Sequence, residues 1–465
     1  MTRARLDGLC LLLLGSSVLL LLSIALHNAV PAGTTDFKSS YFSARGLIQH
    51  CDPYSESEVL RIYRAEGGAS LNTATARQIQ IATRYVYPPT AFSLTVPFAL
   101  LPWGPAYMLW MTLTVGSLVF ASFLAWNLGA NYAPILSGAL IGFLLANSQV
   151  LIILGNPSGI AISLCVVAVW CFLRERFVPA GILCLAVSLA IKPQDAGLVW
   201  LYFLLAGGVY RRRALQTLLA AVAISLPGVL WVWHVAPHWM RELHSNVSAF
   251  AAHGGLNDPG FAATGGRSLD MLISLQTAIS GFRDDPRIYN PVSYLICGSL
   301  LLVWVFATLR SRSSPARAWL AIAAIAPLSM LPVHHHLYDA KLLLLTVPAC
   351  AMLWAGGGLI GRLALLVNTA GFVLTGDLSW SIYFGLTDKL YLSRAVMSGQ
   401  ILTAVQVFTV PLILLVMSIF YLWVYLRRTS WPKLNEVESG KLVAAPSPVH
   451  TQRIAPTPKR PHRVP

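Results

Sequence analysis

Five short polar clusters interrupt a very apolar sequence, and their side chains are of types that handle protons and phosphate. The clusters are Asp36–Lys38, Asp52–Tyr54 with Tyr85–Pro89 after it, Gly155–Asn156, Lys192–Asp195 and His334–Lys341. A carboxylate can take a proton from an attacking hydroxyl, and lysine or histidine can stabilise a departing phosphate. Exclusion of water strengthens both effects. Together the clusters predict group transfer from a lipid-linked phosphate, provided that the fold brings them to one place.

Each cluster also has a structural interpretation. Asp36 could cap a helix over residues 37–48, and Lys192 could extend from a helix end to the membrane surface. Gly155–Asn156 is typical of a tight turn, and Tyr87 of an interfacial aromatic. The three histidines 334–336 could form an interfacial belt. Three adjacent histidines on a helix point in different directions, so they are poor ligands for one metal ion, and we expect no metal.

The composition indicates a membrane protein. Of the 465 residues, 56% are hydrophobic and only 11% are charged, whereas soluble domains carry about 25% charged residues. Such a chain can be neither an ordinary soluble protein nor a disordered one. The net charge of +15 indicates cytoplasmic basic loops and anionic lipid rather than nucleic acid. The sequence has no phosphate-binding loop of the Walker type, and we expect no cofactor.

Twelve apolar runs are candidate membrane helices, since a span needs roughly 17–25 apolar residues. They cover residues 6–26, 104–127, 133–154, 157–173, 178–191, 194–209, 215–235, 291–309, 317–333, 338–354, 359–376 and 397–426. The segment 88–102 is apolar but contains four prolines, which favours a re-entrant or interfacial position. The prediction is an all-α polytopic membrane protein with about 12 transmembrane helices.

The positions of the arginines set the orientation. Arg3 and Arg5 place the N-terminus in the cytoplasm. The later short clusters then fall on the same side; they are Arg174 and Arg176, Arg211–Arg213, Arg310, Arg312 and Arg317, Arg362, and Arg427–Arg428. Both termini are predicted to be cytoplasmic, and the five polar clusters to lie at the outer face. The alternative for the first run is a cleaved signal peptide.

This count divides the chain into a membrane domain and a tail. The domain spans residues 1–428 and includes two large extracytoplasmic loops, 28–103 and 236–290. Residues 429–465 are rich in proline and basic side chains without apolar periodicity, which is typical of a disordered tail. We expect a multi-pass protein of the inner (plasma) membrane, with its active site on the periplasmic or extracytoplasmic side.

The order and spacing of the motifs resemble glycosyltransferase family 87, formerly a domain of unknown function (DUF2029). The matching motifs are Asp36-Phe-Lys-x-x-Tyr41, Asp52-Pro-Tyr54, Tyr87-Pro-Pro followed after seven residues by Pro97-Phe, Gly155-Asn156 and Ala190-Ile-Lys192-Pro193. The resemblance covers most of residues 10–420. Each motif is short, and their common order is much more specific than any one of them.

The resemblance implies a GT-C-like fold and a polyprenyl-phosphate sugar as donor. It implies inversion at the anomeric carbon, an acidic general base after the first helix, here Asp36, and mannose as the best-known sugar. A histidine on a later outer loop is also important in the family; among 334–336 we choose His336, because it stands two residues before Tyr338. Lys192 corresponds to the family's Lys-Pro motif and would neutralise the donor phosphate.

The resulting site prediction has three groups. Asp36 and His336 are predicted to be catalytic, and Lys192, His334 and His335 to bind the donor phosphate. Lys38, Tyr41, Tyr54, Tyr87 and Asn156 are predicted to contact substrate. The partners expected are a polyprenyl-phosphate sugar, a lipid or glycan acceptor and the membrane, with no nucleic acid.

Two other classes of function fit part of the pattern. Twelve spans with both termini inside are also common in secondary transporters of small or lipid-linked solutes. Transporters, however, place charges near the middle of the membrane and often show repeated halves. Here the charges lie at the predicted outer ends of helices, which favours a transferase. A scaffold in envelope assembly is the remaining alternative.

Overall fold

The computed structural model describes residues 2–29, 34–66, 74–260, 272–311, 314–378 and 396–428. Met1–Leu426 form one compact unit, and the description below concerns this unit. The described residues form helices joined by turns and contain no strand, although one isolated antiparallel bridge joins Leu272 to His336. The predicted tail, 429–465, lies outside the described residues.

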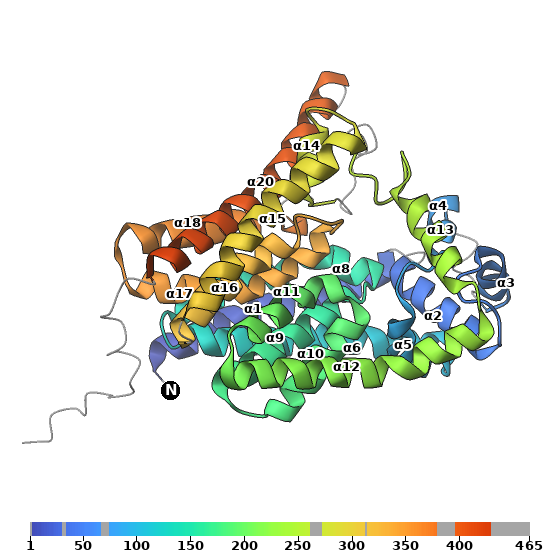
Figure 1. Cartoon of the computed structure of the whole chain (residues 1–465), viewed down its shortest axis with the longest axis horizontal. Helices are drawn as coiled ribbons and strands as arrows, with labels where there is room; N and C mark the ends of the chain where they lie inside the picture. The colour runs from blue at the N-terminus through green and yellow to red at the C-terminus, as the bar shows by residue number, and fades with distance from the viewer. Residues whose placement is uncertain are drawn as a thin grey trace, which may run out of the picture. The chain divides into compact units, whose positions relative to one another are not determined.

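All twelve predicted apolar runs are helical (Figure 1). The corresponding helices are α1 (Arg3–Ala29), α6 (Trp103–Gly129), α7 (Pro134–Ala146) with α8 (Gln149–Leu154), α9 (Ser158–Arg174), α10 (Val178–Ile191), α11 (Pro193–Leu205), α12 (Gly208–Val235), α15 (Pro286–Arg310), α16 (Pro315–Ser329), the 3-10 helix η3 (Leu337–Thr346) with α17 (Val347–Ala355), α18 (Gly358–Leu374) and α20 (Val396–Arg428). The prediction of an all-α polytopic membrane protein is confirmed.

The helices differ in length. Within the described residues, six segments are long and apolar enough to cross a membrane: Arg3–Ala25, Trp103–Gly129, Gly208–Val235, Pro286–Arg310, Leu337–Ala355 and Phe408–Arg427. Five further apolar helices, α7, α9, α10, α16 and α18, have 10–17 residues. Most of the long helices present much of their apolar surface outward, as expected for contact with lipid. Leu337–Ala355 differs, because it is almost wholly enclosed by other helices.

The first helix is tightly integrated into the bundle. Where α1 and α7 meet, glycines on both helices allow the backbones to touch: a Cβ atom added to Gly15 would lie 2.2 Å from the carbonyl oxygen of Gly142. Gly8 and Gly138 approach each other in the same way. Small residues at this spacing are typical of close helix packing in membranes.

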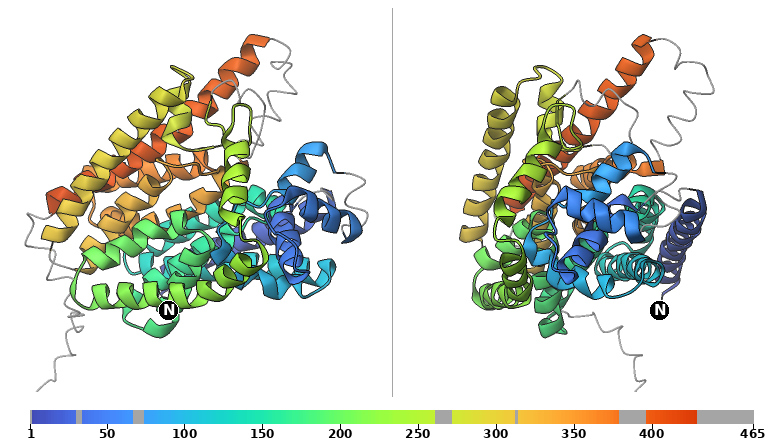
Figure 2. Two further views of the ribbon diagram at one scale, coloured as in Figure 1. Left: turned by 45° about the vertical axis from the view of Figure 1, so that its right-hand side comes forward. Right: turned by 90° about the vertical axis from the view of Figure 1, so that its right-hand side faces the viewer.

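The predicted outer loop 28–103 is itself helical in its described parts. It contains α2 (Thr35–Ile48), α3 (Glu56–Glu66), α4 (Ala76–Thr83), the short 3-10 helix η2 (Pro89–Ala91) and α5 (Phe92–Ala99). These elements form a small aromatic core of their own with the start of α6, at one end of the bundle (Figure 2). The proline-rich segment 88–102 therefore contains two consecutive short helices, η2 and α5, which pack on this core.

The described residues of the second predicted outer loop, 236–290, contain two complete helices and the start of α15 at Pro286. The complete helices are α13 (Trp239–Ala251) and the short α14 (Leu275–Ser280), and residues 261–271 between them lie outside the described part of the chain. The amide of Asn246 in α13 donates hydrogen bonds to the backbone carbonyls of Tyr54 and Tyr85. The side chain of Asn246 thus joins the two predicted outer regions.

Candidate active site

One cavity of about 210 Å³ gathers polar side chains from segments far apart in the sequence. Six of the ten predicted site residues line it: Asp36, Tyr87, Asn156, Lys192, His334 and His336. They come from the start of α2, the segment before η2, the α8–α9 turn, the α10–α11 junction and the segment before η3. All of these positions lie at helix ends, where backbone turns direct side chains into a common space.

Asp36 lies in the first turn of α2, where a negative charge is favoured by the helix dipole. The N-cap residue of α2 is Thr34 rather than Asp36, and the N-cap makes no side-chain capping hydrogen bond. The amide nitrogen Nδ2 of Asn156 donates a hydrogen bond of 2.6 Å to Oδ2 of Asp36. The same nitrogen lies 3.2 Å from the hydroxyl of Tyr87. The Asp36 carboxylate is thus held against the cavity wall rather than used for capping.

Asn156 is fixed in place by a turn. Gly155 ends α8 with φ +62°, a left-handed conformation that glycine adopts without strain. The indole N–H of Trp110 donates to the carbonyl of Gly155 at 2.9 Å. Oδ1 of Asn156 accepts hydrogen bonds from the backbone N–H and the hydroxyl of Ser158, at 2.8 and 2.7 Å. The tight turn expected here therefore also aims the amide N–H₂ of Asn156 at Asp36.

This geometry makes Asn156→Asp an informative change. The new carboxylate can still accept both hydrogen bonds from Ser158, but it loses the N–H donated to Asp36. Two carboxylates this close cannot both ionise easily. If Asp36 acts as a base, we expect the reaction rate to fall at least about tenfold at neutral pH, and the acid limb of the pH–rate profile to move up by about one unit or more.

The measurement is a pH–rate profile on purified protein. Asn131→Asp is the matched control, because Asn131 is exposed, lies outside the cavity and accepts from Arg5 through its oxygen. An unmoved profile for Asn156→Asp would show that this contact does not tune the reaction.

Lys192 is the most strongly paired of the predicted cations. Its Nζ atom lies 2.5 Å from the hydroxyl oxygen of Ser158 and 2.5 Å from Oδ1 of Asp339. Oδ2 of Asp195 is 3.7 Å away. Only 5% of the residue is exposed, so Lys192 does not extend to the membrane surface. It forms a buried ion-pair cluster at the cavity wall, and removing one partner from such a cluster is costly.

The three histidines divide between two sides of one extended segment. His336 has φ −107° and ψ 167°, and successive side chains of an extended chain point to opposite sides. His334 and His336 line the cavity, whereas the side chain of His335 is fully buried, with Nε2 3.2 Å from Oδ1 of Asp195. The segment is therefore extended rather than helical at this point, and this alternation separates His335 from its two neighbours.

His336 and His334 differ in their surroundings. The ring of His336 stacks on Tyr338, with centroids 5.2 Å apart, and its Nε2 atom lies 3.1 Å from Oδ1 of Asn257. His334 also lines the cavity, but unlike the buried His336 it is exposed to solvent. Its ring nitrogens can offer a phosphate a hydrogen bond.

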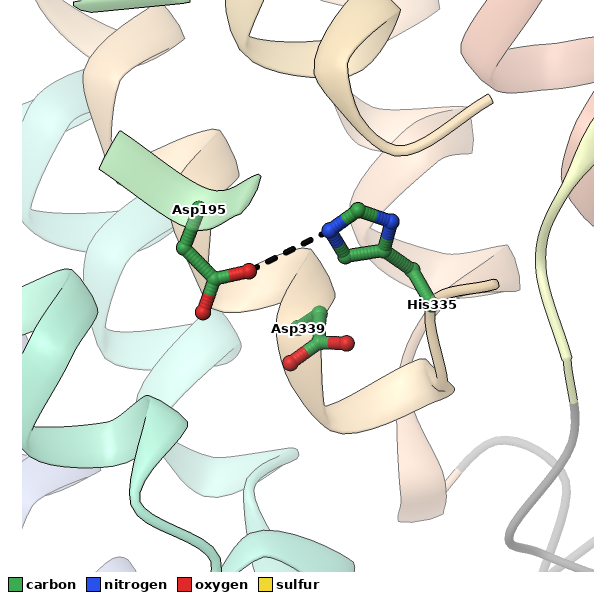
Figure 3. Close-up of side chains that lie close together, drawn as sticks. All are labelled: Asp195, His335 and Asp339. Atoms are coloured by element: carbon green, nitrogen blue, oxygen red, sulfur yellow. Dashed lines mark ion pairs between the residues drawn. The ribbon is translucent and has the colours of Figure 1, made fainter. Parts of the chain in front are cut away.

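Asp195, His335 and Asp339 form the one group of potential metal ligands found among the described residues (Figure 3). Their ligand atoms lie within 4.8 Å of one another. The ammonium of Lys192, however, already lies 2.5 Å from Asp339, so a divalent cation would be repelled at close range. We interpret the group as an ion-pair cluster. The expectation that no metal is needed stays a prediction.

Lys38, Tyr41 and Tyr54 do not line the cavity. The hydroxyl of Tyr41 donates to the carbonyl of Leu101 at 2.8 Å, and that of Tyr54 donates to the carbonyl of Tyr87 at 2.9 Å. Lys38 is buried with its ammonium 5.9 Å from the centre of the Trp103 ring, and burial lowers its pKa to about 8. These three residues support the aromatic core behind Asp36 and Tyr87; their predicted contact with substrate stays a prediction.

Several residues of the cavity region were not among the predicted site residues, and four of them make polar contacts there. Asp339 and Ser158 bind Lys192, Asn257 contacts His336, and Arg84 lines the wall and pairs with Glu56 at 2.8 Å. Asp339 stands inside the predicted histidine cluster, and Ser158 lies two residues after Asn156. Asp339 and Ser158 could have been predicted from their closeness in sequence to predicted site residues. Nothing in the sequence pattern distinguishes Asn257 from other polar residues of its loop.

A model of glycosyltransferase family 87 matches residues 85–332 of the chain, more than half of its length. Comparison with curated proteins and with solved structures finds no match. Tyr87, Asn156 and Lys192 lie inside the matched range, whereas Asp36 and the three histidines lie outside it. Asp36, His334 and His336, which lie outside the matched range, line the same cavity as Tyr87, Asn156 and Lys192, which lie inside it.

Proposed function

The chain belongs to glycosyltransferase family 87, and from that premise we propose that it moves a sugar from a polyprenyl-phosphate donor to a lipid or glycan acceptor. Mannose is the sugar that we favour, because of the family resemblance. One observation carries the proposal: the carboxylate of Asp36 shares a cavity with Lys192 and His336. A proton acceptor and groups that can bind phosphate are the parts that this reaction needs.

In the proposed reaction Asp36 takes the proton of the acceptor hydroxyl. The hydroxyl oxygen then forms a bond to C1 of the sugar, while the bond between C1 and the phosphate oxygen breaks. The electron pair of that bond leaves with polyprenyl phosphate. Attack from the face opposite the phosphate inverts the anomeric carbon. The hydrogen bond of 2.6 Å from Asn156 to Asp36 supports this role, because such bonds favour the ionised carboxylate.

Lys192 and the cavity histidines are the groups proposed to receive the phosphate. The ammonium of Lys192 has three N–H donors, and two of them are used by Ser158 and Asp339. The third serves a ligand or the more distant carboxylate of Asp195. The carboxylates of Asp339 and Asp195 already offset the charge of Lys192. We therefore propose that hydrogen bonds from His336 and His334 also stabilise the departing phosphate.

The orientation in the membrane is part of the proposal. We infer that both termini are cytoplasmic and that the cavity opens on the periplasmic or extracytoplasmic side of the plasma membrane. The short arginine clusters at one set of helix ends support this orientation. A lipid-linked donor suits that side, because its sugar is already attached to a membrane anchor and needs no soluble nucleotide.

His336→Gln tests the histidine assignment. We expect kcat/KM for the donor to fall about a hundredfold, the scale of losing one hydrogen-bond donor to a developing charge. The matched control is His244→Gln on the exposed face of α13. Steady-state kinetics with a polyprenyl-phosphate sugar give the comparison. Equal kcat/KM values for the two variants would remove His336 from the proposed site.

The proposed function is tested by incubating membranes that contain the protein with radiolabelled polyprenyl-phosphate mannose. A new labelled glycolipid or glycan, absent with Asp36→Asn, is the expected result. A product formed from a nucleotide sugar and not from any polyprenyl-phosphate sugar would reject the donor class. Movement of the labelled donor without a new glycosidic bond would favour the transporter alternative.

A further inference from the structure

A second, mainly apolar hollow lies between helices α11, α15 and α16. It has a volume of about 370 Å³. Its wall includes Gly197 and Leu198 of α11, Cys297, Gly298 and Leu301 of α15, and Leu328 of α16. We call this space the α11–α15 groove. The residues 294, 297, 298 and 301 of α15 recur at helical spacing, so they form one stripe about 10 Å long.

Two glycines keep the groove open. A Cβ atom added at Gly197 or at Gly298 would meet no heavy atom within 4 Å. These glycines are therefore not required by close backbone packing, in contrast to Gly15 and Gly142. Glycine lowers helix stability relative to alanine, and in these two helices the missing side chains leave space beside apolar neighbours.

The groove adjoins the cavity of the candidate active site. Gln194 lines both spaces, and it follows Lys192 and Pro193 at the start of α11. On the other side, Val333 lines the groove and the next residue, His334, lines the cavity. Two separate stretches of chain thus pass directly from an apolar wall to residues that can bind phosphate.

From this arrangement we propose that the α11–α15 groove holds the isoprenoid chain of the donor, with the phosphate at Lys192 and His334. The inference rests on the proposed function and adds the place where the lipid binds. An apolar groove that ends at polar and cationic groups is complementary to a molecule with an apolar chain and an anionic head. A second protein helix would match the apolar wall, but would offer no anion to the polar end.

The test uses two donors that differ only in chain length: a long polyprenyl-phosphate sugar and a two-isoprene analogue. Gly197→Leu and Gly298→Leu fill the groove, and the matched control is Gly116→Leu on α6, where an added Cβ also meets nothing within 4 Å. For each protein, the kcat/KM for the long donor is divided by that for the short one. We expect this ratio to fall about tenfold in the groove variants relative to wild type and to Gly116→Leu, the scale of losing about two buried methylene groups.

A ratio equal to the wild-type value in both groove variants would overturn the inference, while transfer by those variants would leave the proposed function standing. If wild type used no polyprenyl-phosphate sugar at all, the proposed function itself would fail. A second measurement avoids dependence on variant folding. Wild-type protein is labelled with a polyprenyl phosphate that carries a diazirine on its chain. Labels within 193–205, 286–310 or 328–333 support the groove, and labels confined to other segments contradict it.

Discussion

Asp36→Asn is expected to lower kcat for sugar transfer about a thousandfold, within the range of losing a positioned general base. Asparagine has the same shape and can accept the hydrogen bond of 2.6 Å from Asn156 through its oxygen. It cannot take the proton of an acceptor hydroxyl. The fold should therefore survive, and donor KM should change little. Initial rates at saturating donor, with a thermal unfolding scan of the same preparation, give both values.

Asp52→Asn is the matched control for this prediction. Asp52 lies in the same outer region, does not line the cavity, and binds the backbone N–H of Tyr54 at 2.9 Å. Asparagine can keep that bond. Burial raises the pKa of Asp52, so the control carboxylate is also partly removed from water. If Asp36→Asn and Asp52→Asn had the same activity, Asp36 would not be the base.

Lys192→Met should have two separable effects. Removing the ammonium leaves the buried carboxylates of Asp339 and Asp195 without their cation, which costs about 3–5 kcal/mol of stability in comparable buried pairs. It also removes a group proposed to bind the donor phosphate. We expect a lower unfolding temperature and a donor kcat/KM reduced at least about a hundredfold.

The double variant Lys192→Met/Asp339→Asn separates the two effects. The introduced asparagine carries no charge to bury, and its oxygen can still accept from the backbone N–H of His336, which binds Asp339 at 3.0 Å. The unfolding temperature should therefore recover toward wild type while donor kcat/KM stays low. Recovery of activity together with stability would show that Lys192 acts only on the fold.

Much of the helical framework could be predicted because lipid demands long apolar runs with internal backbone hydrogen bonds. Residues 178–191 were predicted as an apolar run and form α10 with those bounds. The run 133–154 was predicted as one span but divides into α7 and α8 around Asn147 and Ser148. Such a break depends on local backbone geometry, which apolar character alone does not encode.

The assembly of the candidate site was only partly predictable. Counting spans brings Asp36, Asn156 and Lys192 to one face, because each follows or precedes a helix on that side. It cannot show that Lys192 is paired with Asp339, since residues 147 positions apart meet only through tertiary packing. The separation of His335 from His334 and His336 depends on an extended backbone that follows a helix.

Tyr41 and Tyr54 illustrate a different limit. Their motifs match the family resemblance, yet both hydroxyls donate to backbone carbonyls within the outer aromatic core. A motif reports that a residue type is needed at a position, and it does not separate contact with substrate from support of the residues that line a cavity. The packing places both side chains in the outer aromatic core, and their contact with substrate stays a prediction.

The most direct test is a structure of the protein with a bound polyprenyl-phosphate sugar analogue whose anomeric oxygen is replaced by carbon. We expect the phosphonate within about 4 Å of Lys192 Nζ or in hydrogen-bond contact with His336. We also expect the anomeric carbon in the same cavity as the carboxylate of Asp36. A head group bound elsewhere, with Asp36 and Lys192 both out of its reach, would show that these residues do not form the active site.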